Sequence, residues 1–197
     1  MKTVLVTAFL PFGGEKINPS QKVLEMLPDE ICGLKAEKLL LPVEFVGALI
    51  LAFEKYDTVK PDVVVMLGQA GGRSQITPET TAKNVMNARF PDAVGFMPAG
   101  EKISADGKSV LYSTLPVDKM VKAINDVGVA AAKSDDAGAY VCNCLFYGML
   151  DHADENVPTG FIHVPYIREQ DKIPFMEISD IYKGIVAAIE AVVDNCL

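Results

Sequence analysis

Two segments in the last third of the chain carry residues that could bring a thiol and an imidazole into one site. Residues 137–143 contain Cys142, and residues 160–166 contain His163. The chain has only two histidines, so His152 is the sole other imidazole. Thiolate is the nucleophilic form of cysteine, and a helix N-terminus or a nearby imidazolium lowers a thiol pKa. These residue types therefore indicate nucleophilic catalysis by a thiol.

The elements around these residues would place both side chains at strand ends. Small, aromatic and β-branched residues precede Cys142, and a helical pattern follows from Asn143 to about His152, so we predict a strand that stops at Cys142 and a helix after it. His163 lies inside a second apolar strand, where a polar ring needs a partner. Glu79 is a candidate, because a carboxylate near an imidazole orients the ring and stabilises its cation.

Each of these residues also has a purely structural interpretation. Cysteine is among the most buried residue types, so Cys142 could be an ordinary core thiol. Its position at a strand-to-helix junction favours the nucleophile instead. Cys144, two residues further on, is predicted to lie in the core. His152, near acidic residues at a helix end, is predicted to face solvent.

Apolar strand-like runs alternate with amphipathic helical patterns along the whole chain, which predicts one α/β domain, residues 1–197, with helices on both faces of a sheet. The predicted strands are 3–8, 34–41 and 62–67, and the predicted helices are 20–27, 44–56, 117–127 and 178–193. Ligands bind beyond the carboxyl ends of strands in open α/β sheets. We therefore expect segments 9–14, 68–79, 142–143 and 163–166 to meet at that edge.

Composition limits the function classes. The net charge of −8 argues against a nucleic-acid partner, and no segment has the roughly 18 apolar residues of a membrane span. The N-terminal run resembles a first strand rather than a secretion signal, so we expect a cytoplasmic protein with four free cysteines. The glycine cluster at 68–72 lacks the spacing of nucleotide-binding loops, and no metal-ligand set is evident, so no cofactor is expected.

Several motifs follow one another in order along nearly the whole chain. They are FLPFGG (9–14) with NPS (18–20), GQAGGRS (68–74) with Glu79, ARFPD (88–92), STLP (113–116), AGAYVCN (137–143) and GFIHVPYI (160–167). Together they closely resemble the pyroglutamyl peptidase I, or pyrrolidone-carboxylate peptidase, family. The resemblance implies an open α/β/α sandwich with a mostly parallel twisted sheet, in a cytoplasmic, commonly homotetrameric cysteine peptidase. Such enzymes remove an N-terminal pyroglutamate from peptides without a cofactor.

The same resemblance assigns roles to individual residues. It implies Cys142 as the nucleophile, His163 as the base and Glu79 as the third member of the triad. For the substrate pocket, it points to the rings of Phe9 and Phe12 as holding the lactam, to Gln69 in the same pocket and to Arg89 near the site.

The chain departs from the family pattern at a few positions, and two alternatives stay open. Thr80 and Thr81 follow Glu79 where a basic and an apolar residue are usual, Ala8 replaces a glycine, and Ala93 replaces an asparagine. One alternative is therefore a weakened or inactive homologue that binds pyroglutamyl peptides or related small molecules. The other is an amidotransferase-type hydrolase, although Tyr140 and Cys144 stand where a nucleophile elbow usually has glycine.

Overall fold

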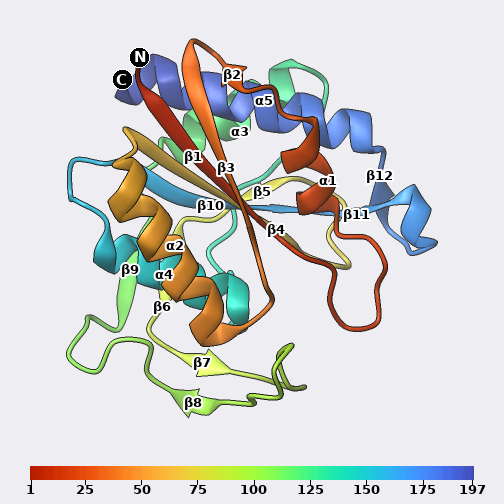
Figure 1. Ribbon diagram of the computed structural model, residues 1–197. Helices are drawn as coiled ribbons and strands as arrows, with labels where there is room; N and C mark the ends of the chain where they lie inside the picture. The colour runs from red at the N-terminus through yellow and green to blue at the C-terminus, as the bar shows by residue number, and fades with distance from the viewer.

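A six-stranded mixed sheet forms the centre of the computed structural model, which describes residues 1–197 (Figure 1). Its strands, in the spatial order β2-β3-β1-β4-β10-β5, are Glu30–Ile31, Leu34–Leu41, Thr3–Phe9, Val63–Gln69, Thr159–Val164 and Thr77–Pro78. The four middle strands, β3, β1, β4 and β10, are parallel. The short edge strands β2 and β5 run antiparallel to their neighbours. Most of the sheet is therefore parallel, as expected.

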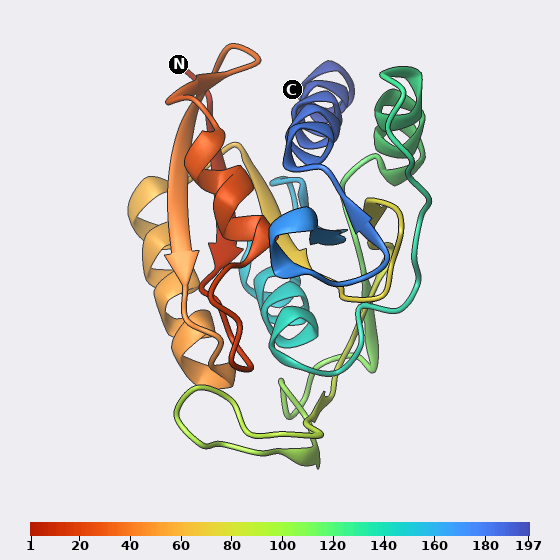
Figure 2. The ribbon, with the colours of Figure 1, turned by 90° about the vertical axis from the view of Figure 1, so that its right-hand side faces the viewer.

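Helices cover both faces of the sheet (Figure 2). They are α1 (Pro19–Met26), α2 (Phe45–Val59), α3 (Val117–Asp126), α4 (Val141–His152) and α5 (Ile178–Cys196). One apolar core joins the sheet to α1, α3 and α5, and a second joins it to α2 and α4. The predicted three-layer α/β/α arrangement is confirmed. None of these helices is both long and apolar enough to cross a membrane.

Short paired strands fill the connections. β6 (Thr81–Lys83) pairs with β9 (Val110–Tyr112), β7 (Met86–Asn87) with β8 (Ala99–Glu101), and β11 (Tyr166–Ile167) with β12 (Phe175–Met176). A turn of 3₁₀ helix, Arg168–Gln170, follows β11. The β7–β8 arm extends from one end of the molecule in both ribbon views (Figures 1 and 2).

Local chemistry explains where two of the helices begin. Asn18 caps α1, because its side-chain oxygen accepts a hydrogen bond from the Ser20 amide at 3.0 Å, and Pro19 occupies the first helical position. Glu44 makes no side-chain cap for α2. The carboxylate of Asp92, far along the chain, instead accepts from the Phe45 amide at 3.0 Å. The loop that contains the Ala93 departure is therefore tied to the start of α2.

One predicted element is absent. Residues 137–140 form no strand, and α4 already begins at Val141, so Cys142 lies in the first turn of the helix and not at a strand end. Gly138 has a φ of +80°, which interrupts an extended run. The apolar side chains of Ala137 and Val141 are buried in the core beside α2 and α4. Burial of this segment, rather than pairing in the sheet, produced its apolar pattern.

Candidate active site

The first turn of α4 and two neighbouring parallel strands bring the thiol and the imidazole to one place. In the β4–β10 pair, His163 lies opposite Gly68. A Cβ atom on Gly68 would lie 3.0 Å from Cys142 Sγ and 2.7 Å from Phe161 Cζ, so the absence of a side chain lets the thiol approach β4. Cys142 and His163 are thus found at the same level of the sheet. The expected meeting of segments 68–79, 142–143 and 163–166 is confirmed.

A carboxylate lies directly behind the imidazole. His163 Nδ1 and Glu79 Oε1 are 2.7 Å apart, and both side chains are buried. Since a carboxylate accepts, Nδ1 carries the proton and donates, which leaves Nε2 with the lone pair that accepts a proton. Glu79 reaches this position because its backbone amide donates to the Phe161 carbonyl at 2.8 Å. The backbone hydrogen bond to β10 therefore fixes the position of Glu79 relative to His163.

An arginine that sequence reasoning did not single out completes the environment of Glu79. Arg73 Nη1 lies 2.5 Å from Glu79 Oε1 and 2.5 Å from Thr77 Oγ1, and its Nη2 donates to the Asp136 carbonyl at 2.8 Å. The other carboxylate oxygen, Oε2, is buried without a hydrogen-bond partner. The one available sequence signal was a lone cation between the glycine turn and Glu79, six residues before the carboxylate.

Electrostatics give this site a neutral nucleophile and a neutral base at rest. Burial acts to raise the pKa of Glu79, but the hydrogen bond and charge of His163, with smaller contributions from hydrogen bonds of Ser134 and Arg73, outweigh it, so that pKa is lowered and the carboxylate is ionised. Burial lowers the pKa of His163 despite Glu79. Burial raises the pKa of the Cys142 thiol to about 12, and the negative charge of Glu79 acts in the same direction. The expectation of a lowered thiol pKa is therefore wrong for the resting site.

The first turn of α4 offers free backbone donors beside the thiol. The amides of Cys142 and Asn143 donate to no backbone carbonyl, as is usual for the first residues of a helix. Asn143, which is fully buried, holds this turn in place. Its Oδ1 accepts from the Lys83 amide at 2.9 Å, and its Nδ2 donates to the Lys83 and Val85 carbonyls at 2.9 and 3.0 Å. The helix start is thereby attached to β6.

A cavity of about 490 Å³ opens next to the carboxyl end of β4. Its lining residues are Phe12, Gly13, Glu15, Gln69, Phe90, Pro91, Tyr166 and Lys172. Two of the predicted pocket residues, Phe12 and Gln69, therefore lie together, and the loop after β1 reaches the same edge as expected. Gln69 Oε1 accepts from Gln170 Nε2 at 2.9 Å, and the side-chain nitrogen of Gln69, Nε2, donates to no other residue.

The other two predicted pocket residues lie outside this lining. Phe9 is buried at the end of β1 and packs in the core against which Phe12 and Cys142 also lie. Arg89 is exposed and forms no ion pair. The segment that contains Arg89 nevertheless contacts the residues just before α4, because the backbone amide of Asn87 donates to the Ala139 carbonyl at 2.8 Å. No group of three or more His, Cys, Asp or Glu side chains is arranged to hold a metal ion.

Other residues that the sequence analysis considered are also placed. Cys144 is buried in the core, as predicted. His152 is exposed, as predicted, and one face of its ring stacks on Phe53 with centroids 4.1 Å apart. Its Nε2 also lies 3.0 Å from Asp57 Oδ1. It is distant in the fold from Glu79 and does not compete with His163 for that carboxylate.

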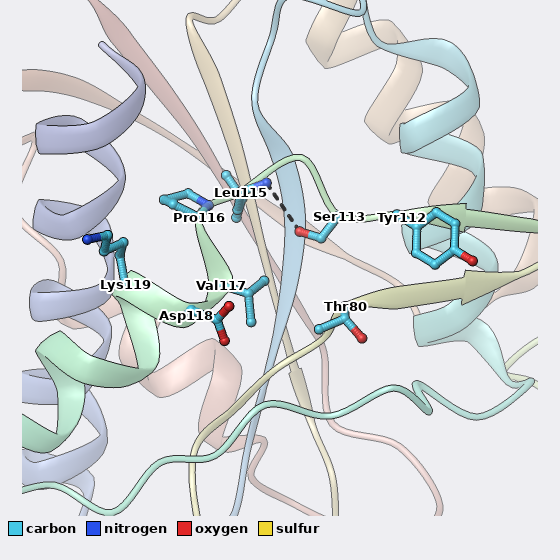
Figure 3. A pocket seen from close by; sticks show the side chains of 8 residues that line it. All are labelled: Thr80, Tyr112, Ser113, Leu115, Pro116, Val117, Asp118 and Lys119. Atoms are coloured by element: carbon cyan, nitrogen blue, oxygen red, sulfur yellow. Dashed lines mark hydrogen bonds between the residues drawn. The ribbon is translucent and has the colours of Figure 1, made fainter.

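Thr80, one of the departures from the family pattern, lines a second cavity (Figure 3). Thr80 lies at its edge with Ser113, Leu115 and Asp118, and the cavity volume is again about 490 Å³. The Thr80 amide and hydroxyl both donate to the Ser134 carbonyl, at 2.7 and 3.0 Å. Neither contact reaches the Glu79 carboxylate directly, although Ser134, which Thr80 binds, is one of the groups that lower the pKa of Glu79.

An α/β sandwich that gathers a thiol, an imidazole and a carboxylate beyond its parallel strands has the arrangement of a cysteine hydrolase. Comparison with known proteins agrees with this class. Residues 2–195 match the family model described as pyroglutamyl peptidase. The chain belongs to the pyroglutamyl peptidase family.

Curated relatives and solved structures extend the match along the whole chain. The chain is 42 % identical to pyrrolidone-carboxylate peptidase 1 of Caldanaerobacter subterraneus, over 96 % of this chain and 97 % of the relative. It is 43 % identical to the pyrrolidone-carboxylate peptidase of Clostridium perfringens, over 98 % and 93 %. The crystal structure of pyroglutamyl peptidase I from Bacillus amyloliquefaciens superposes with a TM-score of 0.92 at 39 % identity, covering 98 % of this chain and 95 % of that one. The pyrrolidone carboxyl peptidase of Thermococcus litoralis gives 0.95 at 34 % identity, covering 98 % and 94 %.

Proposed function

We propose that this protein is a thiol-dependent peptidase that hydrolyses the bond after an N-terminal pyroglutamyl residue. The observation that carries the proposal is the site at Gly68, where the thiol of Cys142 lies against β4 beside His163. Glu79, 2.7 Å from the imidazole, orients the ring. The substrate class comes from the family to which the chain belongs.

In the first half of the reaction, Cys142 Sγ attacks the carbonyl that joins pyroglutamate to the next residue. His163 Nε2 takes the thiol proton as the S–C bond forms, since both groups are neutral at rest. Glu79 stabilises the resulting imidazolium. The tetrahedral intermediate then collapses to a thioester as the C–N bond breaks, and His163 gives its proton to the leaving amine.

In the second half, water hydrolyses the thioester. His163 takes a proton from the water as it attacks the acyl carbon, and returns that proton to the sulfur when pyroglutamate leaves. The negative oxygen of both tetrahedral intermediates faces the free amides of Cys142 and Asn143 at the start of α4. All steps use groups of this chain and need no metal or organic cofactor.

Specificity follows from the chemistry of a five-membered lactam, which is neutral and has no free amine. The ring of Phe12, which lines the cavity, forms its apolar surroundings with Phe9 in the core behind it, and the side-chain nitrogen Nε2 of Gln69 donates to the ring carbonyl. Arg89 lies at the side of the site. Proline lacks the ring oxygen and would leave that amide unpaired, so it is a poor substrate.

The assay is hydrolysis of a fluorogenic pyroglutamyl amide by the purified protein. We expect steady turnover that iodoacetamide abolishes, and at least 10³-fold less activity in a Cys142→Ala variant. Cys196→Ser is the matched control, because Cys196 is another partly buried free thiol outside the site, and it should keep the parent rate. A prolyl amide should be cleaved far more slowly. Binding of a pyroglutamyl peptide without turnover would instead support the non-catalytic alternative.

The remaining expectations complete the proposal. Residues 1–197 act as one domain in the cytoplasm, on peptides and not on nucleic acid or membranes, and the chains assemble as a homotetramer. Light scattering on the eluting peak of a sizing column tests the assembly, with an expected mass four times the 21.2 kDa of one chain.

A further inference from the structure

Arg73 connects three parts of the candidate site through one guanidinium group. It contacts Thr77 on β5, the carboxylate of Glu79 and the carbonyl of Asp136. Asp136 belongs to the segment that leads into α4 and therefore to Cys142. The imidazole side and the thiol side of the site are thus tied together by a single side chain.

Arg73 is also the only permanently charged group paired with Glu79, whose other partner is the imidazole of His163. Glu79 Oε1 accepts from both of them, whereas Oε2 has no partner. Without Arg73, the carboxylate would lose one of the two hydrogen bonds that hold Oε1, and the imidazole would be the remaining donor to that oxygen. Arg73 does not line the cavity beside Gln69, so it does not contact a ligand bound there.

We propose that Arg73 is a positioning residue that holds the Glu79 carboxylate against His163 and ties it to the segment before Cys142. The inference rests on the proposed peptidase function for its kinetic consequence. Its geometric content is independent of that function, because it concerns how the His163 ring is held.

The planar fork of arginine explains why this residue type occupies the position. One guanidinium nitrogen, Nη1, contacts Thr77 and Glu79, and the other, Nη2, donates to the Asp136 carbonyl. A lysine has a single nitrogen on a flexible stem, so it cannot make these contacts in one fixed geometry. The positive charge has a second effect. Two charged groups act on His163: Glu79 raises the pKa of the imidazole, and Arg73 lowers it. The Cys142 thiol is a further titratable group near His163, because it lies against Gly68, the residue opposite His163 on β4. Removing Arg73 therefore raises the pKa of His163.

The kinetic test compares Arg73→Met and Arg73→Lys with the parent over a range of pH. We expect kcat of Arg73→Met to fall about 10–100-fold, because a misplaced base loses alignment, with KM changed less than about 3-fold. The acid limb of kcat/KM should move to higher pH. Arg73→Lys, which keeps the charge and loses the fork, should lose kcat while its acid limb stays near that of the parent. Lys83→Met is the control: Lys83 pairs with the same Asp136, through Oδ1 at 2.9 Å, but does not touch Glu79.

A second measurement separates this proposal from the proposed function. The chain has two histidines, so ¹⁵N-imidazole NMR observes His163 directly, with a His152→Gln variant for assignment. In the parent, His163 should show a protonated Nδ1 at neutral pH, and Arg73→Met should raise its titration midpoint or broaden that signal, even if no peptide is hydrolysed. Unchanged kcat and an unchanged His163 titration in Arg73→Met would overturn the proposal. So would failure of both Arg73 variants to fold, which would make the role purely structural.

Discussion

Individual atoms in this site have contacts that fix the orientation of the His163 ring. His163 donates through Nδ1 to an ionised Glu79, which leaves Nε2 as the acceptor. The partly buried Cys142 thiol does not ionise unaided, because its desolvation in the site raises its pKa to about 12. In the proposed reaction the base therefore takes the proton during attack. A residue that changes the pKa or the position of His163 should then change the rate of that reaction.

A Glu79→Gln variant tests this at the level of one atom. Glutamine keeps a hydrogen-bond acceptor and removes the charge that stabilises the imidazolium, so kcat should fall about 10²–10⁴-fold. Because Glu79 raises the pKa of His163, the acid limb of kcat/KM should move to lower pH, opposite to the shift expected for Arg73→Met. Glu155→Gln, at an exposed position, is the control. If the acid limb of kcat/KM moved to higher pH in Glu79→Gln, the pairing of Glu79 with His163 would be contradicted.

At the scale of elements, the start of α4 decides where the nucleophile lies. No side chain caps this helix from its N-cap residue, Tyr140. The buried Asn143 instead attaches the first turn to the backbone of Lys83, the last residue of β6, through two hydrogen bonds and to the Val85 carbonyl through a third. On the other side, Gly68 of β4 allows the close approach of Sγ. The position of the Cys142 thiol is thus set by the Asn143 hydrogen bonds, which hold the start of α4, and by Gly68, which leaves room for Sγ beside β4.

Asn143→Ala should lower both stability and activity. It leaves two carbonyls and one amide without partners in a buried region, so the free energy of unfolding should fall by about 2–4 kcal/mol. Urea denaturation followed by circular dichroism measures this, and kcat/KM of the folded variant should fall as α4 moves. Asn87→Ala, at an exposed position without side-chain hydrogen bonds, should change stability by less than about 0.5 kcal/mol. Equal effects of the two substitutions would show that Asn143 is not the attachment.

At the scale of the whole molecule, two cores on opposite faces of one sheet support a site at its edge. The parallel strands β1, β4 and β10 are buried on both faces, as strands between two helical layers must be. This burial extends into the site and gives His163 and Cys142 their altered pKa values. The same groups make the stability of the fold depend on pH.

Stability should be highest between about pH 6.5 and 9 and should fall on both sides. The folded pKa of His163 is lowered from 6.5, so below that pH the unfolded chain binds a proton that the folded one does not, and stability is lost as pH falls. The pKa values of Cys142 and Cys144 are raised from 9.0 to about 12, so the unfolded thiols lose protons first and stability is lost as pH rises through this range. Urea midpoints at several pH values measure the curve. In a Cys142→Ala variant, the loss of stability with rising pH should be less steep than in the parent. An equally steep loss would contradict the contribution assigned to the Cys142 thiol.

Local patterns were enough to predict much of the fold. Alternating and helical apolar spacings placed the strands at 34–41 and 62–67 and the helices at 44–56 and 178–193 within a few residues of their observed bounds. Residues 137–142 were mispredicted as a strand. Their apolar side chains are buried beside α2 and α4 without sheet pairing, and a sequence pattern reports burial but not the partner that causes it.

By itself, the sequence determined that the protein is an α/β chain with one plausible imidazole for its thiol, because only two histidines exist and the motifs around Cys142, His163 and Glu79 occur in family order. Tertiary structure alone decided how these groups are held. The Arg73 contacts join residues up to 63 positions apart, and the Cys142 and His163 pKa shifts arise from burial. Both depend on distances through space, which residue spacing along a chain does not contain.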